Sequence, residues 1–201
     1  LLNLSIISDG NIRYACDLTK GMDCSVCDND YSIIYNDNID AVIISASYKR
    51  QIEIAKLCII AQKHVLLDKI IGSPKQIIDL YDLAKEKNVI IYVGLFKRHH
   101  SDYMAIKDKL SNIKNIYSVN KKPLQKPYRT SNGLIGEMIY YDLDIILNYL
   151  DYKMPNKILA IGNTNNKELK KVKEYESMDV KLIYDTGLST WWMIGGTATR
   201  S

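Results

Sequence analysis

Short apolar runs alternate with helical patterns through the first 95 residues. The runs that predict strands lie at residues 2–7, 24–28, 40–45, 64–67 and 88–94. Helical patterns occupy the intervening residues 11–20, 50–62 and 74–87. Ser73 followed by Pro74 is typical of a helix start. This alternation predicts parallel strands with right-handed crossovers, so we expect residues 1–95 to form a Rossmann-like α/β domain.

The pattern changes in residues 96–201. Helices are expected at 102–110 and 133–150, a strand near 115–119, and a polar, proline-bearing loop over 121–132. The remaining β-like runs lie at 157–161, 180–184 and 188–194. Asp185-Thr186-Gly187 before the last run is a hairpin signal, because glycine tolerates positive φ. We expect a partial α+β domain with an open, mostly antiparallel sheet. Because the chain begins at Leu1, we also expect it to be a piece of a longer chain or to have trimmed ends.

Composition narrows the function classes. The chain is 47% apolar and 25% charged, and no apolar run approaches the roughly 18 residues that cross a bilayer. The net charge of +4 comes from lysines interspersed with aspartates, so we expect neither a nucleic-acid nor a membrane partner. The four cysteines lack the spacing of a disulfide framework, which favours a reducing, cytoplasmic location.

Two short motifs could indicate metal or redox chemistry. Cys24 and Cys27 form a single CxxC without the second ligand pair of a zinc site, so two ordinary thiols are favoured over a redox or metal role. His99 and His100 are adjacent and would point about 100° apart on a helix, which is a poor arrangement for one ion. No metal is expected.

The turn after the first strand reads Ser8-Asp9-Gly10-Asn11-Ile12. A dinucleotide fingerprint has three glycines here, and only Gly10 is present. The turn could expose amides toward a phosphate, but Asp9 would repel one. Asp28 ends the second strand, where an acid binds an adenosine ribose, although an aspartate there is also a common turn former.

Four ordered segments then carry a resemblance. They are Asp40-Ala-Val-Ile-Ile-Ser45, Lys63-His-Val-Leu-Leu-Asp68-Lys69, Val89-Ile-Ile-Tyr-Val-Gly94 with Arg98, and Gly136-Glu-Met-Ile-Tyr-Tyr-Asp-Leu-Asp144. Together they resemble the glucose-fructose oxidoreductase, inositol dehydrogenase and rhizopine-catabolism (Gfo/Idh/MocA) family. Its corresponding segments read approximately VDaViiaTP, GkhVlxEKP, vGfxxRf and GGxxxDxGxHxxD.

The resemblance implies NAD(P)-dependent hydride transfer on a small-molecule sugar, polyol or related alcohol. It implies a catalytic Lys69, with Tyr141 in the place of the family histidine and Glu137 in the place of the family aspartate. A phenol can donate a proton if a nearby cation lowers its pKa from about 10. The implied cofactor-binding residues are Ser8, Gly10, Asn11, Ile12, Asp28, Ser45, Ala46, Asp68, Lys69 and Arg98. NAD is favoured over NADP, because Asp28 would repel a 2′-phosphate.

Departures from the family pattern keep a second hypothesis open. Two fingerprint glycines are missing, Ile70 follows the lysine where the family has proline, and Ser47 stands where another family proline would be. Lys69 could be a solvated strand-end lysine, and Tyr141 a packing tyrosine. The chain could therefore be a catalytically silent relative that binds a ligand or protein. The family's yeast galactose-pathway repressor resembles a relative of this kind.

Trp191 and Trp192 are neighbours in a predicted strand, so their side chains should lie on opposite faces of the sheet. One ring should be buried and the other exposed. Three short strands cannot cover their own second face, and large exposed aromatic faces are unusual for monomers. We therefore expect a homo-oligomer that pairs through the C-terminal sheet.

Overall fold

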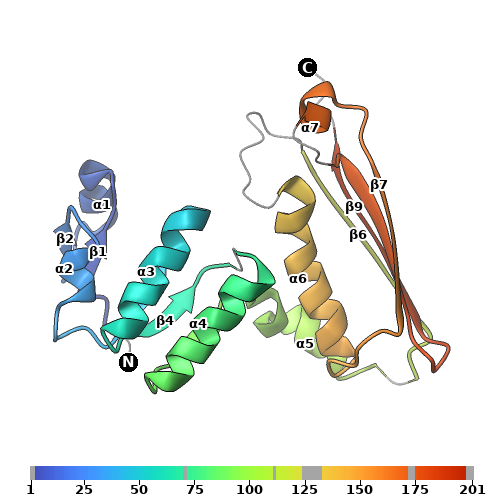
Figure 1. Cartoon of the computed structure of the whole chain (residues 1–201), viewed down its shortest axis with the longest axis horizontal. Helices are drawn as coiled ribbons and strands as arrows, with labels where there is room; N and C mark the ends of the chain where they lie inside the picture. The colour runs from blue at the N-terminus through green and yellow to red at the C-terminus, as the bar shows by residue number, and fades with distance from the viewer. Residues whose placement is uncertain (1–2, 70–71, 111, 124–132, 172–174, 198–201) are drawn as a thin grey trace. The chain divides into compact units, whose positions relative to one another are not determined.

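The computed structural model of the chain divides into two compact units, residues 1–94 (unit 1) and residues 95–201 (unit 2). It describes residues 3–69, 72–110, 112–123, 133–171 and 175–197 (Figure 1). The division lies one residue from the boundary expected from the sequence. The functions assigned to the two parts stay predictions.

Unit 1 alternates strands and helices. Its strands are β1 (Ile6–Ser8), β2 (Ser25–Cys27), β3 (Ala41–Ile44), β4 (His64–Leu67) and β5 (Ile91–Val93). Its helices are α1 (Ile12–Leu18), α2 (Tyr31–Ile34), α3 (Tyr48–Ile60) and α4 (Pro74–Glu86). All strand pairs are parallel, which confirms the expected class. Within the described residues they form two sheets, β1-β2 and β3-β4-β5.

Helices α3 and α4 supply much of the core of unit 1. Their apolar faces bury Ala55, Cys58, Ile59, Leu80 and Ala84. The expected start of α4 is confirmed, since Ser73 Oγ accepts the Gln76 amide at 3.3 Å and Gln76 Oε1 accepts the Ser73 amide at 3.0 Å. Between β2 and β3 the chain forms only the four-residue α2.

Unit 2 consists of a four-stranded sheet and helices. Its strands are β6 (Asn115–Pro123), β7 (Lys157–Asn163), β8 (Ser177–Ile183) and β9 (Ser189–Thr197). Its helices are η1 (Phe96–His99), α5 (Ser101–Lys107), α6 (Gly133–Tyr149) and α7 (Lys167–Lys171). The sheet order is β6-β9-β8-β7, with β6 parallel to β9 and the other pairs antiparallel.

The sequence reading of unit 2 was wrong in two places. Strand β6 continues through Pro123, where a loop from residue 121 was expected, because residues 121–123 pair in register with β9. Helix α7 was not predicted. The rest of the expected loop, residues 124–132, lies outside the described residues. The predicted hairpin turn is confirmed: Gly187 has φ +79° and donates to the Tyr184 carbonyl at 3.1 Å.

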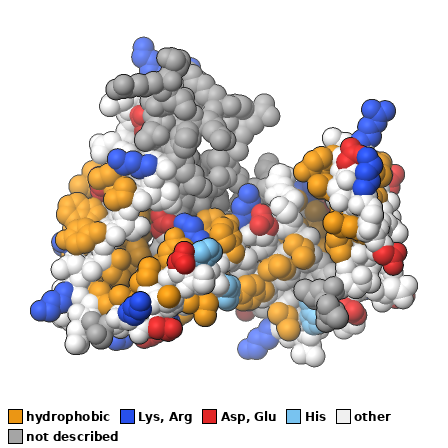
Figure 2. Space-filling model, turned by 180° about the vertical axis from the view of Figure 1, so that it is seen from behind, with side chains coloured by type: hydrophobic (Ala, Val, Ile, Leu, Met, Phe, Trp, Pro, Cys, Tyr) orange, Lys and Arg blue, Asp and Glu red, His pale blue; other side chains and the backbone are white. Residues whose placement is uncertain are grey.

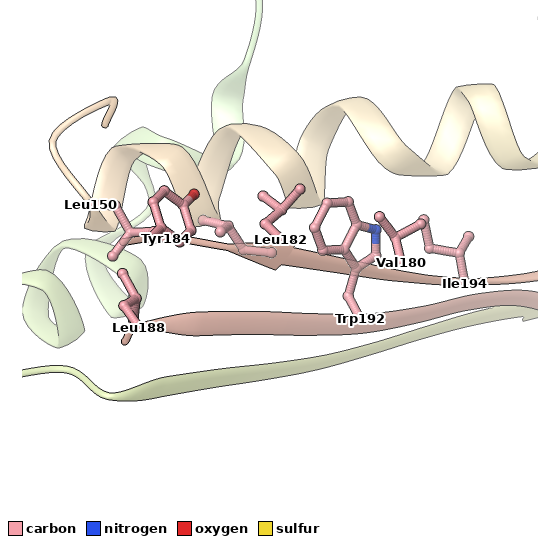
Figure 3. Close-up of a cluster of buried hydrophobic side chains, with 8 residues drawn as sticks. Leu150, Val180, Leu182, Tyr184, Leu188, Trp192 and Ile194 are labelled. Atoms are coloured by element: carbon pink, nitrogen blue, oxygen red, sulfur yellow. The ribbon is translucent and has the colours of Figure 1, made fainter. Parts of the chain in front are cut away.

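Helix α6 runs along one face of this sheet (Figure 1). Buried apolar side chains fill the layer between them (Figure 3): Ile146, Leu150, Val180, Leu182, Tyr184, Leu188, Trp192 and Ile194. Trp192 is 1% exposed and Trp191 is 46% exposed. The prediction that the two rings lie on opposite faces is therefore confirmed.

The surface carries apolar side chains on both units (Figure 2). Among the described residues, no helix combines the length and apolar character needed to cross a membrane.

Candidate functional site

The carboxyl ends of the parallel strands of unit 1 gather several of the predicted cofactor-binding residues. Ser45 follows β3 and Asp68 follows β4, and Ser45 Oγ donates to Asp68 Oδ2 at 3.2 Å. The sequence thus identified two side chains that the fold brings into contact. Lys69 comes directly after Asp68 and is half-buried, and Ala46 after Ser45 is also half-buried. This is the edge at which open α/β sheets bind ligands.

Gly94 fixes the position of this edge. Its amide donates to the Leu67 carbonyl at 2.7 Å, which holds the end of β5 against the end of β4. A Cβ on Gly94 would lie 2.9 Å from the Asp68 carbonyl oxygen, closer than such atoms approach. The position therefore requires glycine, and the close contact holds the backbone of Asp68 in place.

The turn after β1 is closed by its own side chains. Asp9 Oδ1 accepts the Asn11 amide at 2.6 Å, and Asn11 Oδ1 accepts the Tyr14 amide at 3.1 Å. A Cβ on Gly10 would meet nothing within 4 Å, so there is room above the turn. Ile12 begins α1 and is exposed. The turn is therefore open at Gly10, but the Asp9 carboxylate already accepts the Asn11 amide, one of the donors that a pyrophosphate would use.

The end of β2 carries two aspartates in different environments. Asp28 Oδ1 accepts a hydrogen bond from Nδ2 of the neighbouring Asn29 at 2.8 Å. Asp30 is tied more firmly: Ser8 Oγ donates to its Oδ1 at 2.8 Å, and Arg50 donates to its Oδ2 from Nε at 3.1 Å and from a terminal nitrogen at 2.6 Å. This hydrogen bond and charge raise the pKa of the Arg50 guanidinium above its ordinary value.

Sequence reasoning missed Asp30 and Arg50. They border a small crevice of about 90 Å³ between α2 and α3. Its other lining residues are Tyr31, Ile34, Glu53, Ile54 and Leu57. The spacing 50, 53, 54 and 57 on one face of α3 was the available signal, but nothing in the sequence indicated that the shortened α2 would leave this face open.

Unit 2 holds a second polar cluster, built around Tyr141 on α6. The Phe96 ring packs on the Tyr141 ring, with 5.1 Å between centroids and a 55° tilt. Lys97 Nζ lies 5.7 Å from the Tyr141 centroid and 3.0 Å from Asp142 Oδ1. Asn120 Nδ2 donates to Asp142 Oδ2 at 2.8 Å. Both carboxylate oxygens of Asp142 therefore have partners.

Arg98, a predicted cofactor-binding residue, lies in unit 2 and is engaged there. Its guanidinium donates to both oxygens of Asp144, from Nε at 2.9 Å to Oδ2 and from a terminal nitrogen to Oδ1. It also lies over the Tyr152 ring at 5.7 Å. Glu137 lies on α6 one turn before Tyr141, but its side chain is outside the described set. Lys69 belongs to unit 1 and Tyr141 to unit 2, so their meeting at one substrate stays a prediction.

The cysteines and histidines form no metal centre in the described part of the chain, where no three His, Cys, Asp or Glu side chains gather. Cys24 precedes β2 and Cys27 ends it, and Cys27 Sγ lies 3.3 Å from the Asn29 carbonyl. His99 ends η1, whereas His100 caps α5, so the two are not on one helix. Burial raises the pKa of the Cys58 thiol to about 11, which makes this cysteine a poor nucleophile.

Comparison with known proteins identifies the family. Residues 2–95 match the Gfo/Idh/MocA family, described as an oxidoreductase family with an NAD-binding Rossmann fold. Residues 2–95 belong to this family. The recognition made from the four sequence segments is confirmed.

Among curated proteins, the chain is similar to myo-inositol 2-dehydrogenase from Thermotoga maritima, with 23% identity over 167 residues. This match covers 78% of the chain and 50% of the relative. Among solved structures it is similar to scyllo-inositol dehydrogenase from Lactobacillus casei, with 21% identity, a TM-score of 0.81 and coverage of 97% and 61% of the two chains. Myo-inositol 2-dehydrogenase from Lactobacillus plantarum gives 17% identity, a TM-score of 0.84 and coverage of 100% and 64%.

The Gfo/Idh/MocA match and the structural matches differ in reach. The family match ends at residue 95, almost at the end of unit 1, whereas the structural matches include the fold of unit 2. The chain spans half the length of the curated relative and under two thirds of these two structures. The roles of Tyr141 and Glu137 fall beyond the matched residues and stay predictions.

Proposed function

We propose that this Gfo/Idh/MocA chain is an NAD-dependent oxidoreductase that transfers a hydride between nicotinamide and a carbinol carbon of a sugar or polyol. The observation that carries the proposal is the match of the NAD-binding Rossmann family to residues 2–95, nearly the same residues as unit 1. The inositol dehydrogenases among its relatives support a polyol as the substrate class.

The residues of unit 1 fit a dinucleotide along most of the strand edge. Ser8 and Asp28 would serve the adenosine end, and the space above Gly10 would admit the backbone of the ligand. Ser45, Ala46, Asp68 and Lys69 would lie toward the nicotinamide. The bound nicotinamide would accept or supply the hydride with its electron pair.

The remaining step is proton transfer at the substrate oxygen. In the reduction direction the Tyr141 phenol would donate its proton to the oxygen that becomes a hydroxyl, and in oxidation the phenolate would take it back. The Lys69 ammonium would stabilise negative charge on that oxygen. Glu137, one turn before Tyr141, would complete the acid/base set.

Polyol-dependent reduction of NAD⁺ tests this proposal. We expect Tyr141→Phe to lower kcat by at least about 100-fold, because a positioned acid/base group contributes this much. Tyr117→Phe, an exposed tyrosine on β6, is the matched control and should retain activity. Lys69→Met should lose activity and Lys75→Met should not. Absence of NAD⁺ reduction with inositols, other polyols and sugars would overturn the proposal.

The turn after β1 favours a second candidate function, the catalytically silent relative. Asp9 places a carboxylate where a pyrophosphate would lie and holds the Asn11 amide. A chain of this kind would bind a different ligand or a protein with the same strand edge. A dinucleotide titration separates the two candidates, because only the enzyme requires saturable binding.

We also propose self-association through the outer face of the unit 2 sheet. Its exposed apolar side chains are Tyr117, Val119, Leu159, Ile161, Trp191 and Met193. They come from β6, β7 and β9, and register places Tyr117 beside Trp191 and Val119 beside Met193. A cytoplasmic location stays a prediction, supported by four free cysteines.

A further inference from the structure

Within unit 2, Tyr141 has a cationic neighbour, Lys97. Lys97 Nζ lies 5.7 Å from the centroid of its ring, and the Phe96 ring packs against the same phenol. Phe96 and Lys97 are consecutive in η1, so one short element holds both contacts. A cation at this distance from a ring contributes electrostatic attraction and fixes the ring orientation.

Lys97 is itself held in place. Its ammonium pairs with Asp142, whose side chain is only 9% exposed, and Asn120 on β6 donates to the other Asp142 oxygen. A buried carboxylate without partners would be costly, so Asp142 needs both donors. The Lys97 side chain is 26% exposed. The cluster thus joins η1, β6 and α6 around one phenol.

The charges around Tyr141 can be assigned element by element. From η1 they are Lys97 and Arg98, and Arg98 is directed to Asp144. From α6 they are Asp142, Asp144 and Glu137, whose side chain is not described. Strand β6 contributes the neutral Asn120, and its neighbour Lys121 is exposed and alternates to the other face. The side chain of Lys122, also in β6, lies outside the described set. Lys97 thus contacts the ring of Tyr141, and Asp142, its ion-pair partner, directly follows Tyr141 in the sequence.

We propose that Lys97 is the positioning residue of Tyr141: held by Asp142 and Asn120, it orients the phenol and supplies the positive charge that favours the phenolate during proton transfer. The inference rests on the proposed function, since it concerns the acid/base step of that reaction. It assigns to Lys97 a charge-stabilising role that the family resemblance implied for Lys69, and it requires no contact between the two units.

The test measures the ionisation of residue 141 directly. Difluorotyrosine, which ionises near neutral pH, is placed at position 141 of the full chain, and its pH midpoint is followed by fluorine NMR. We expect Lys97→Met to raise the midpoint by about one pH unit, because a cation close to the group has been removed. We expect Asp142→Asn to lower it by a similar amount, because Lys97 then keeps its charge uncompensated.

Opposite shifts distinguish an electrostatic role from a structural one. If Lys97 only supported the fold, both variants would loosen the site and move the midpoint in the same direction or not at all, and the proposal would be overturned. Lys97→Arg should keep the midpoint within a few tenths of a pH unit, since the charge is retained. Lys107→Met is the matched control. Lys107 also forms an ion pair in unit 2, at 3.3 Å, but its partner Asp151 follows the end of α6 and is ten residues after Tyr141. This variant should cause no shift.

Kinetics separate this inference from the proposed function. If the chain oxidises a polyol, Lys97→Met should lower kcat about tenfold or more with little change in KM, and Lys97→Arg should restore most of it. If the midpoints shift in opposite directions but no polyol is oxidised, the positioning role stands and the proposed function fails. If polyols are oxidised but the midpoints do not move, the proposed function stands and Lys97 has no such role.

Discussion

Each unit of this chain contains an arginine paired with an aspartate, and the two pairs differ in burial. In unit 1, Arg50 and Asp30 have side chains that are 63% and 23% exposed. In unit 2, Arg98 and Asp144 have side chains that are 21% and 6% exposed. The same type of ion pair therefore lies at the surface in unit 1 and is largely buried in unit 2.

The difference shows where the fold fixes polar groups. In unit 2 the helix α6 lies on a sheet with a well-filled apolar layer, so Asp142 and Asp144 must be paired and their geometry is set by the core. In unit 1 the strand-end groups satisfy one another locally, as Asp9 and Asn11 do in the turn. The polar cluster of unit 2 is part of the fold. The strand-end side chains of unit 1, in contrast, can exchange their mutual hydrogen bonds for hydrogen bonds to a ligand.

The largest expected effect concerns these arginines. Arg98→Met leaves Asp144 buried without its guanidinium, which should lower the free energy of unfolding by about 3–5 kcal/mol. Urea unfolding followed by tryptophan fluorescence measures it, since Trp192 lies in the unit 2 core.

Arg50→Met is the matched control in unit 1. Its partner is more exposed, so the loss should be at most about 1 kcal/mol. Equal decreases in the free energy of unfolding for the two variants would contradict the distinction between a buried and a surface ion pair.

The two faces of the unit 2 sheet provide the next test. Trp192→Ala removes a ring from the apolar layer and should cost about 3–5 kcal/mol of unfolding free energy. Trp191→Ser should cost much less, because its ring is 46% exposed, and should instead weaken self-association in sedimentation velocity. A monomeric wild-type chain would contradict the proposed self-association. Equal stability of the two variants would contradict the assignment of the two rings to opposite faces.

A smaller effect is expected at the turn after β1. Asp9→Ala frees the Asn11 amide and removes a negative charge, so it should tighten NADH binding about tenfold, or about 1.4 kcal/mol. Asp17→Ala is the control, because it removes a negative charge from exposed α1 without touching the turn. If Asp17→Ala also tightens NADH binding, or if Asp9→Ala does not tighten it, Asp9 does not limit the affinity for NADH.

The sequence predicted what depends on local pattern. Apolar periodicity predicted the strands of unit 1 and its helices α1, α3 and α4. Local spacing also predicted the capped start at Ser73 and the opposite faces of Trp191 and Trp192. Ser45 and Asp68 were both predicted to bind the cofactor, and they lie in contact because parallel strands end at the same edge.

The remaining features depend on pairing between distant segments. The parallel pairing that extends β6 to Pro123 is set by β9, more than 70 residues later, and residues 121–123 alone have no strand pattern. Lys97 and Asp142 are 45 residues apart, and no local spacing connects them. Asp30 was missed because Asp28 stands at the expected position, while the Ser8 and Arg50 contacts that distinguish Asp30 come from two other elements.

The central claim is that unit 1 binds a nicotinamide dinucleotide, and titration of the full chain with NADH and NADPH by fluorescence tests it most directly. We predict saturable binding of both, with NADH about tenfold tighter, because Asp28 would accept hydrogen bonds from a ribose diol and repel a 2′-phosphate. Binding of NADPH as tight as NADH would contradict the placement of Asp28. If neither NADH nor NADPH binds to the unaltered chain or to Asp9→Ala, the proposed enzymatic function is contradicted. The catalytically silent relative is then the remaining candidate.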